Sequence, residues 1–252
     1  MGKGIGVLIS FDAVILIILT FATLSQTLFG VGVLLWGTPA LLLYGYNFPD
    51  ALSLVLPISL AISGLQVWSG RNEINRPLVR KFILFASPTL VLSLIYVFTF
   101  DTSIRLLISG ALFLGVVVKV IRNKINVRTK LFNKYVDGLC IGIIGAIHGM
   151  SNLGGSLLVL RVSFSTANQF DYRPTVALVY LVFASIQLTT LYSLQISTFQ
   201  NVHYAAFAIV LYFIFNRFIF LRINQQKFEI CNNILIMCMA ALLAAQHYDL
   251  IQ

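Results

Sequence analysis

Two glycine-containing stretches are where this sequence most clearly offers chemistry. They are Gly30 to Pro39, with the sequence GVGVLLWGTP, and Asn152 to Arg161, with the sequence NLGGSLLVLR. Both lie in long apolar runs, yet glycine costs a helix interior about 1 kcal/mol and proline about 3 kcal/mol relative to alanine. In a membrane, broken backbone is tolerated only where it is buried in protein or lines a cavity. The two stretches therefore predict two helix breaks that together form a site.

The chemistry expected of such a site is anion binding. Glycine lets backbone N–H groups approach a ligand without interference from a Cβ atom. The N-terminus of a half-helix carries partial positive charge, which contributes about 0.3 to 2 kcal/mol to anion binding. Two opposed ends would hold one oxyanion weakly and reversibly, which suits a transporter.

The second break carries most of the candidate side chains. The residues expected to contact a substrate here are His148, Ser151, Asn152, Gly154, Gly155, Ser156 and Arg161. His148 is either a packing residue or a proton-coupling group, because the unperturbed pKa of histidine lies near physiological pH. Arg161 is either an interfacial side chain that reaches the lipid headgroups or a countercharge, since an arginine at membrane depth tends to mark an ion pathway.

The first break adds Gly30, Gly32, Gln26 and Thr38 to the predicted site. Polar side chains such as Gln26 and Thr38 commonly join helices through hydrogen bonds, so helix packing and substrate contact are both open for them. Gln187, in a later apolar run, is costly to expose to lipid. We expect Gln187 to face protein or a pore, as part of the substrate site.

The composition of the whole chain places these breaks in a membrane. Of the 252 residues, 59% are hydrophobic and only 10% are charged, which predicts an all-α integral membrane protein. The net charge of +9 is interpreted as basic loops on the cytoplasmic side, with no nucleic-acid partner. The three cysteines lack metal-ligand spacing, so neither a metal nor another cofactor is expected.

Catalytic and nucleotide-binding motifs are not found in the sequence. It contains no HExxH, CxxC or Walker A pattern and no pair of carboxylates within one apolar segment. We therefore expect a protein that is not an enzyme and that draws on an ion gradient or on the gradient of its own substrate. The spacings Gly138 to Gly142 and Gly145 to Gly149 are more typical of a helix contact surface.

Ten apolar segments follow one another along the chain. They cover residues 8–29, 31–47, 50–68, 81–99, 103–122, 135–150, 153–169, 174–196, 200–221 and 227–246. If each broken pair of segments returns to the side where it began, all 17 basic residues except Lys3 and Arg105 fall on one face, which the positive-inside rule makes cytoplasmic. Both chain ends are then outside. Counting each broken pair as one spanning helix fits the rule less well.

A basic stretch divides these segments into two groups of five, which predicts two repeats. The first repeat covers residues 1–122, the second covers 135–252, and residues 123–134 form a cytoplasmic linker within one membrane domain. Because each repeat crosses the membrane an odd number of times, the second is inverted relative to the first, as is typical of secondary transporters. Each repeat is expected to start with a glycine-broken helix or hairpin.

At these motifs the sequence resembles the sulfite exporter TauE/SafE family, whose pattern runs approximately G-I-G-G-G-x-L-L-V-P-x-L in both halves. The matching positions are Gly30, Gly32 and Pro39 in the first half and Gly154 and Gly155 in the second. Asn152 stands at the first glycine of the second half, Ser156 at the third and Arg161 at the proline. The resemblance implies a permease of the cytoplasmic (inner) membrane for sulfur-containing and other organic anions.

Two functions from different classes are compatible with these observations. The first is a secondary transporter or facilitator for a small anion of the sulfite, thiosulfate or sulfonate class, with proton coupling as an option. The second is a non-transporting membrane protein in which the breaks are packing features and the chain serves assembly or interaction. The expected partners are a small anionic substrate and the lipid bilayer, and a homodimer is a further option.

Overall fold

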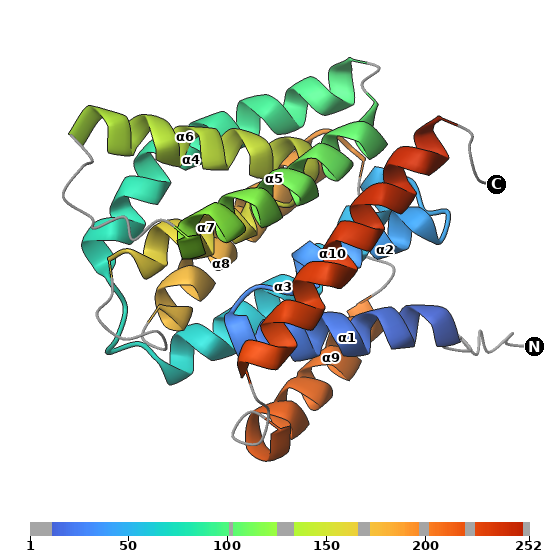
Figure 1. The fold of residues 1–252 in the computed structure, drawn as a ribbon, viewed down its shortest axis with the longest axis horizontal. Coiled ribbons are helices and arrows are strands. Elements are labelled where there is room, and N and C mark those ends of the chain that lie inside the picture. Colours follow the sequence, from blue (N-terminus) through green and yellow to red (C-terminus); the bar gives the residue numbers. More distant parts are fainter. Residues whose placement is uncertain are drawn as a thin grey trace, which may run out of the picture.

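The computed structural model describes residues 12–100, 103–124, 134–165, 172–196, 202–219 and 225–248. The helices formed by these residues (Figure 1) are α1 (Ala13–Phe29), α2 (Val33–Leu43), α3 (Phe48–Ser69), α4 (Arg76–Thr99), α5 (Ile104–Lys124), α6 (Lys134–Ser151), α7 (Gly155–Ser163), α8 (Arg173–Ser193), α9 (Val202–Ile214), the π-helical turn η2 (Phe215–Ile219) and α10 (Gln225–His247). No strand occurs among the described residues. The all-helical prediction is therefore confirmed, and the ten predicted segments appear in the predicted order. Most of the predicted linker, residues 125–133, lies outside the described residues.

Both predicted helix breaks are present. The first falls at Gly30, whose φ of 74° ends α1 in a left-handed conformation that glycine adopts without steric cost. The second falls at Asn152, a non-glycine residue with a φ of 62°. Asparagine tolerates this region better than most residues. Pro39 lies inside α2, so glycine and asparagine, rather than proline, make the breaks.

The helices that follow the breaks are too short to cross a bilayer. At 1.5 Å per residue, α2 with its 11 residues and α7 with its 9 residues reach about 16 and 14 Å, roughly half of the ~30 Å hydrocarbon core. Among the described residues, four helices are long and apolar enough to span: α3, α4, α8 and the Ile230–His247 part of α10. The structure is thus consistent with a membrane protein in which α2 and α7 are half-helices.

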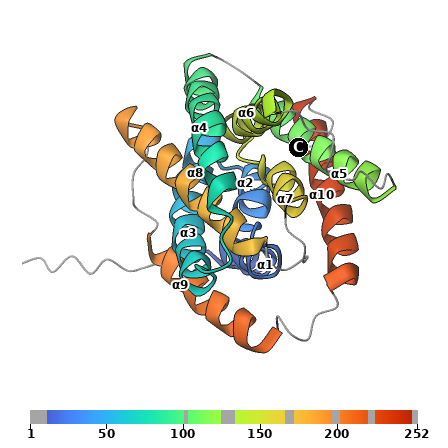
Figure 2. The ribbon, with the colours of Figure 1, turned by 90° about the vertical axis from the view of Figure 1, so that its left-hand side faces the viewer.

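The half-helices occupy the middle of the molecule. Figure 2 shows α2 and α7 between the α3/α8 pair on one side and the α5/α10 pair on the other. The contacts agree, because α2 touches α3 and α10 while α7 touches α8 and α5. The half-helices α2 and α7 also touch each other. This arrangement brings both breaks into the protein interior, where broken backbone can be supported by protein groups.

The close pairing of α4 with α6 depends on glycines. A Cβ atom at Gly145 would meet the carbonyl oxygen of Ala86 and would lie 2.5 Å from Thr89 Oγ1. Thr89 Oγ1 also donates a hydrogen bond of 2.8 Å to the carbonyl oxygen of Gly142. Small residues that let two backbones approach are a common helix contact in membranes. The prediction that this glycine spacing marks a helix contact surface is confirmed.

Replacing Gly145 with alanine should force α4 and α6 apart, because the added methyl group meets backbone atoms that cannot rotate away. We expect Gly145→Ala to lower the free energy of unfolding by about 1 to 3 kcal/mol, the usual cost of overpacking. Gly110→Ala on α5 is the matched control, since nothing lies within 4 Å of its added Cβ atom. Thermal unfolding of the detergent-purified variants measures both. A Gly145→Ala variant as stable as Gly110→Ala would contradict this account of the α4/α6 contact.

Candidate functional site

Protein groups satisfy the polar side chain at the first break. Gln26 is fully buried, and its Oε1 atom accepts a hydrogen bond from the N–H of Val33, the first residue of α2, at 3.3 Å. Its Nε2 atom lies 3.4 Å from Ser63 Oγ and 3.3 Å from Gln66 Oε1 on α3. Gln66 Nε2 in turn donates to the carbonyl oxygen of Gln26 at 2.9 Å. Gln26 therefore joins α1, the start of α2 and α3.

Two more side chains hold the first break. Asn232 on α10 accepts hydrogen bonds through Oδ1 from Trp36 Nε1 at 2.7 Å and from Ser25 Oγ at 3.1 Å. Arg173, at the start of α8, donates from Nη1 to the carbonyl oxygen of Thr27 at 3.1 Å. A cation beside the last carbonyls of a helix is stabilising. Four helices besides α2 thus meet at this break.

The two breaks are joined by one hydrogen bond between buried side chains. Asn152 Nδ2 donates to Thr38 Oγ1 at 2.8 Å, and both residues are 0% exposed. This contact confirms that the two motifs, far apart in the sequence, meet in space. The Oδ1 atom of Asn152 has no hydrogen-bond partner among the described residues. Asn152 therefore links the breaks and still has an acceptor atom to offer.

Around the second break, several buried polar groups make no well-aligned hydrogen bond with the residues that the structure describes. These groups are both ring nitrogens of His148, both amide atoms of Gln187 and the hydroxyl of Tyr180. His148 and Gln187 are 0% exposed and Tyr180 is 1% exposed. The His148 ring lies 5.5 Å from the Tyr180 ring and is nearly perpendicular to it, and the Gln187 side chain is close enough to the imidazole to be its hydrogen-bonding partner. Unpaired groups at this depth are costly, so their clustering in one place marks a candidate site.

The start of α7 lies against this cluster. A Cβ atom at Gly155 would fall on the Tyr180 hydroxyl, and one at Gly154 would lie 2.7 Å from His148 Cβ. Gly154, the residue that caps α7, supplies no side-chain acceptor for the first N–H groups of the helix. The helix end, with its partial positive charge, therefore lies beside His148 and Tyr180.

Two predicted residues point elsewhere. Ser151 Oγ donates to the carbonyl oxygen of Ile147 at 2.6 Å and accepts from the N–H of Leu153 at 3.3 Å, so both of its bonds are local. Ser156 faces α5, where a Cβ atom at Gly115 would lie 3.2 Å from Ser156 Cβ. Their predicted contact with a substrate stays a prediction.

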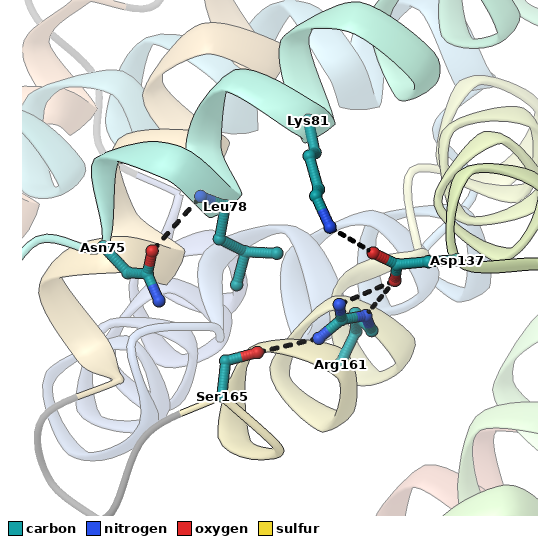
Figure 3. A network of polar contacts seen from close by, with 6 residues as sticks. All are labelled: Asn75, Leu78, Lys81, Asp137, Arg161 and Ser165. Atoms are coloured by element: carbon teal, nitrogen blue, oxygen red, sulfur yellow. Dashed lines mark hydrogen bonds and ion pairs between the residues drawn. The ribbon is translucent and has the colours of Figure 1, made fainter. Parts of the chain in front are cut away.

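Arg161 lies in the last turn of α7, away from the break (Figure 3). Its Nε atom donates to Asp137 Oδ1 at 2.7 Å and its Nη1 atom donates to Ser165 Oγ at 2.8 Å. The other carboxylate oxygen of Asp137 accepts from Lys81 Nζ, also at 2.7 Å. This triad of Lys81, Asp137 and Arg161 ties α4, α6 and α7 together. The structure does not bring Arg161 to the His148 cluster, and its predicted role as a countercharge stays a prediction.

Several residues at the breaks were not among the predicted site residues. They are Tyr180 at the second break and Ser63, Gln66, Asn232 and Arg173 at the first. Tyr180 lies in the middle of an apolar segment, whereas interfacial tyrosines gather at segment ends. Its place in the middle of the segment could have identified Tyr180 as a candidate site residue. The partners of the first break come from three other helices, and no local pattern points to them.

Removing the link between the breaks should destabilise the fold. We expect Thr38→Val to lower the free energy of unfolding by about 1 to 3 kcal/mol, because it leaves the buried Asn152 amide without its acceptor. The matched control is Thr99→Val, since Thr99 Oγ1 bonds only to Ile95 of its own helix at an exposed position. Thermal unfolding in detergent measures both variants. Equal stability of the two variants would mean that the hydrogen bond between the breaks does not stabilise the fold.

Comparison with known proteins agrees with this arrangement. Residues 15–243 match the sulfite exporter TauE/SafE family, which leaves only the chain ends outside the match. Neither a curated protein nor a solved structure matches the chain. The family consists of membrane transporters of sulfur-containing anions. With two helix breaks meeting in an apolar helical fold and a family match over nearly its full length, this chain belongs to the sulfite exporter TauE/SafE family.

Proposed function

We propose that this protein carries a small oxyanion of the sulfite, thiosulfate or sulfonate class across the cytoplasmic membrane and binds it at the second helix break. The observation that carries this proposal is the set of buried polar groups on His148, Tyr180 and Gln187, for which the described part of the chain supplies no well-aligned hydrogen-bond partner beyond the contact of Gln187 with the imidazole. Buried polar groups are normally paired. A bound oxyanion would supply the missing partners, since its oxygens accept several hydrogen bonds at once.

The donors at the second break suit an oxyanion. The Tyr180 hydroxyl, the Gln187 amide and one N–H of the His148 ring can each donate to a ligand oxygen. The start of α7 adds a favourable field for negative charge. The unpaired Oδ1 atom of Asn152 can accept a hydrogen bond from a protonated ligand. These neutral groups bind an anion without a permanent ion pair, which keeps release easy.

The other predicted residues take supporting roles in this proposal. Gln26, Gly30, Gly32 and Thr38 hold the first break, and Thr38 positions Asn152 through the hydrogen bond between them. A Cβ atom at Gly32 would lie 2.5 Å from the carbonyl oxygen of Ala22, so this glycine permits the close approach of α2 to α1. Arg161 anchors the far end of α7 through Asp137.

The helix contacts support two repeats related by an approximate two-fold axis. If each of α1 to α5 is exchanged with the helix five places later, α3/α8, α5/α10 and α2/α7 map onto themselves. The same exchange turns α3/α9 into α8/α4, α1/α9 into α6/α4 and α2/α10 into α7/α5, and all of these pairs are in contact. The inverted orientation of the second repeat and the cytoplasmic position of the basic face rest on the charge distribution.

The alternative of a non-transporting assembly protein fits the second break less well. A break kept only for helix packing should have its polar groups paired within the protein, as the first break does. The polar groups of the second break lack such partners among the described residues. Buried polar groups without partners lower the stability of the fold, and their presence here indicates a ligand.

The sharpest test removes the Tyr180 hydroxyl, which has no hydrogen-bond partner in the described part of the chain. Tyr180→Phe should leave the unliganded protein as stable as before or slightly more stable, because an unsatisfied buried group is removed. Its affinity for the substrate anion should fall by about 3- to 10-fold, the equivalent of one hydrogen bond. Gln187→Leu should also lower the affinity for the anion. Melting temperatures with sulfite, thiosulfate, sulfoacetate, acetate and chloride provide the measurement, since a ligand of the folded state raises the melting temperature.

The control for this experiment lies on the same helix. Thr189 is exposed on α8 and bonds only to the carbonyl oxygen of Ser185, so Thr189→Val should bind the anion like the wild type. A sulfur oxyanion that stabilises the wild type and Tyr180→Phe equally would remove Tyr180 from the site. Stabilisation by none of the anions would contradict the proposed substrate class.

We extend the proposal to proton coupling through His148. Histidine exchanges protons near neutral pH in water, and His148 lies beside the proposed anion-binding groups with both ring nitrogens unpaired. A proton taken up with the anion would offset the cost of carrying its charge through the membrane. Transport of anion and proton together would then be driven by a pH gradient.

The variant His148→Gln tests this coupling, because glutamine keeps a hydrogen-bonding side chain but does not titrate. In proteoliposomes, we expect His148→Gln to lose most of the anion uptake driven by a pH gradient and to retain anion exchange at equal pH. Uptake that still responds fully to the pH gradient would exclude His148 as the coupling group. Loss of both activities would instead assign His148 to anion binding alone.

A further inference from the structure

A groove runs along the outer side of the α4/α6 pair, and the proposed transport site makes no use of it. The groove has a volume of about 570 Å³ and is lined by residues that include Phe85, Thr89, Tyr135, Leu139, Gly142 and Ile143. It exists because Gly138 and Gly142 put no side chains between the two helices. Its walls are apolar apart from the Tyr135 hydroxyl at one end and Thr89, whose hydroxyl bonds to backbone oxygens.

The dimensions of the groove match one leaflet of a bilayer. Its lining on α6 extends from Tyr135 to Ala146, which at 1.5 Å per residue is about 16 Å, or half of the ~30 Å hydrocarbon thickness. Leu139 and Ile143 are 66% and 50% exposed on its rim, so the groove opens outward from the helices. Such a groove is shaped for one extended hydrocarbon chain.

One end of the groove carries positive charge. Lys81 lies one helical turn before Phe85 on α4, and its Nζ atom pairs with Asp137, the residue next to Gly138 (Figure 3). Since Arg161 shares the same carboxylate, two cations face one anion and the triad has a net charge of +1. Lys81 is 45% exposed at the side chain, and its ammonium has three donors, so it can bind a further acceptor.

Two other features favour a negative group at this end. Helix α6 begins here at Lys134, one residue before Tyr135. The partial positive charge of its N-terminus therefore adds to the positive field at this end. The Tyr135 side chain, 83% exposed, lines the same end and offers a hydroxyl donor.

We propose that the α4/α6 groove binds an anionic phospholipid, with one acyl chain between the helices and the phosphate at Lys81 and Tyr135. The charge of +1 on the triad is balanced by the single charge of the phosphodiester. This site is separate from the second break and does not depend on the proposed substrate. Because α6 leads to His148 and Asp137 anchors α7 through Arg161, the lipid lies against the elements that hold the second break.

Native mass spectrometry of the detergent-purified protein tests the proposal. Phosphatidylglycerol and phosphatidylcholine with identical acyl chains are added separately, and glycerol phosphate is added as the headgroup alone. We expect the wild type to retain phosphatidylglycerol about fivefold more than phosphatidylcholine, the factor expected for one basic residue beside an anionic headgroup. Glycerol phosphate should not be retained, because it lacks the chain that fills the groove.

Two variants and two controls separate the headgroup from the chain. Lys81→Gln should abolish the preference for phosphatidylglycerol, and Lys81→Arg should keep it. Ala146→Phe, which fills the groove, should reduce the retention of both lipids. Arg105→Gln, an exposed basic residue on another helix, should behave like the wild type.

Three results would overturn the proposal. Equal retention of the two lipids by the wild type would mean that the charged end of the groove does not distinguish an anionic headgroup from a zwitterionic one. Retention of glycerol phosphate at the level of the lipid would assign the triad to free anions. A wild-type dimer that Ala146→Phe converts to monomers would show that a second copy of the chain, and not a lipid, occupies the groove.

Discussion

The fold depends on the partners that the polar backbone groups of two interrupted helices find inside a membrane. A chain that breaks a helix in hydrocarbon leaves N–H and C=O groups that water cannot reach. At the first break, the Gln26 side chain takes the place of the missing helical acceptor for Val33, and Arg173 donates to the carbonyl oxygen of Thr27. Because these partners come from α1 and α8, and Gln66 adds α3, the break itself holds the helices together.

The second break lies at a similar place in the second half of the chain, but its polar side chains are paired differently. Gln26 and His148 each lie four residues before the residue that breaks the helix. Gln26 has three polar neighbours within the protein, whereas both ring nitrogens of His148 are without a partner among the described residues. The two breaks thus differ in their pairing: the described residues pair the polar groups of Gln26 at the first break, and leave several polar groups at the second break unpaired. The difference lies in side chains rather than in topology.

The sequence predicts the backbone features well because their causes are local. Glycine at 30 and the glycine pair at 154 and 155 weaken a helix wherever they occur, and apolar runs report the helices directly. The sequence predicts the site less completely, because the partners of its polar side chains come from distant parts of the chain. Asp137 meets Lys81 and Arg161 only after α4, α6 and α7 have packed, and no spacing in the sequence reveals this.

Arg161, the most conspicuous residue of its motif, lies in the last turn of α7, at the end away from the second break. Its charge attracts attention in an apolar segment, yet six residues of helix place it about 9 Å along the axis from Gly155. Its guanidinium is engaged by Asp137, whose side chain is 5% exposed. Removing Arg161 would leave Asp137 paired with Lys81 alone and would break the ion pair between α6 and α7. Loss of transport in an Arg161 variant would therefore not separate a change in the fold from the loss of a countercharge, whereas the Tyr180 hydroxyl, which bonds nothing in the described protein, reports on the ligand.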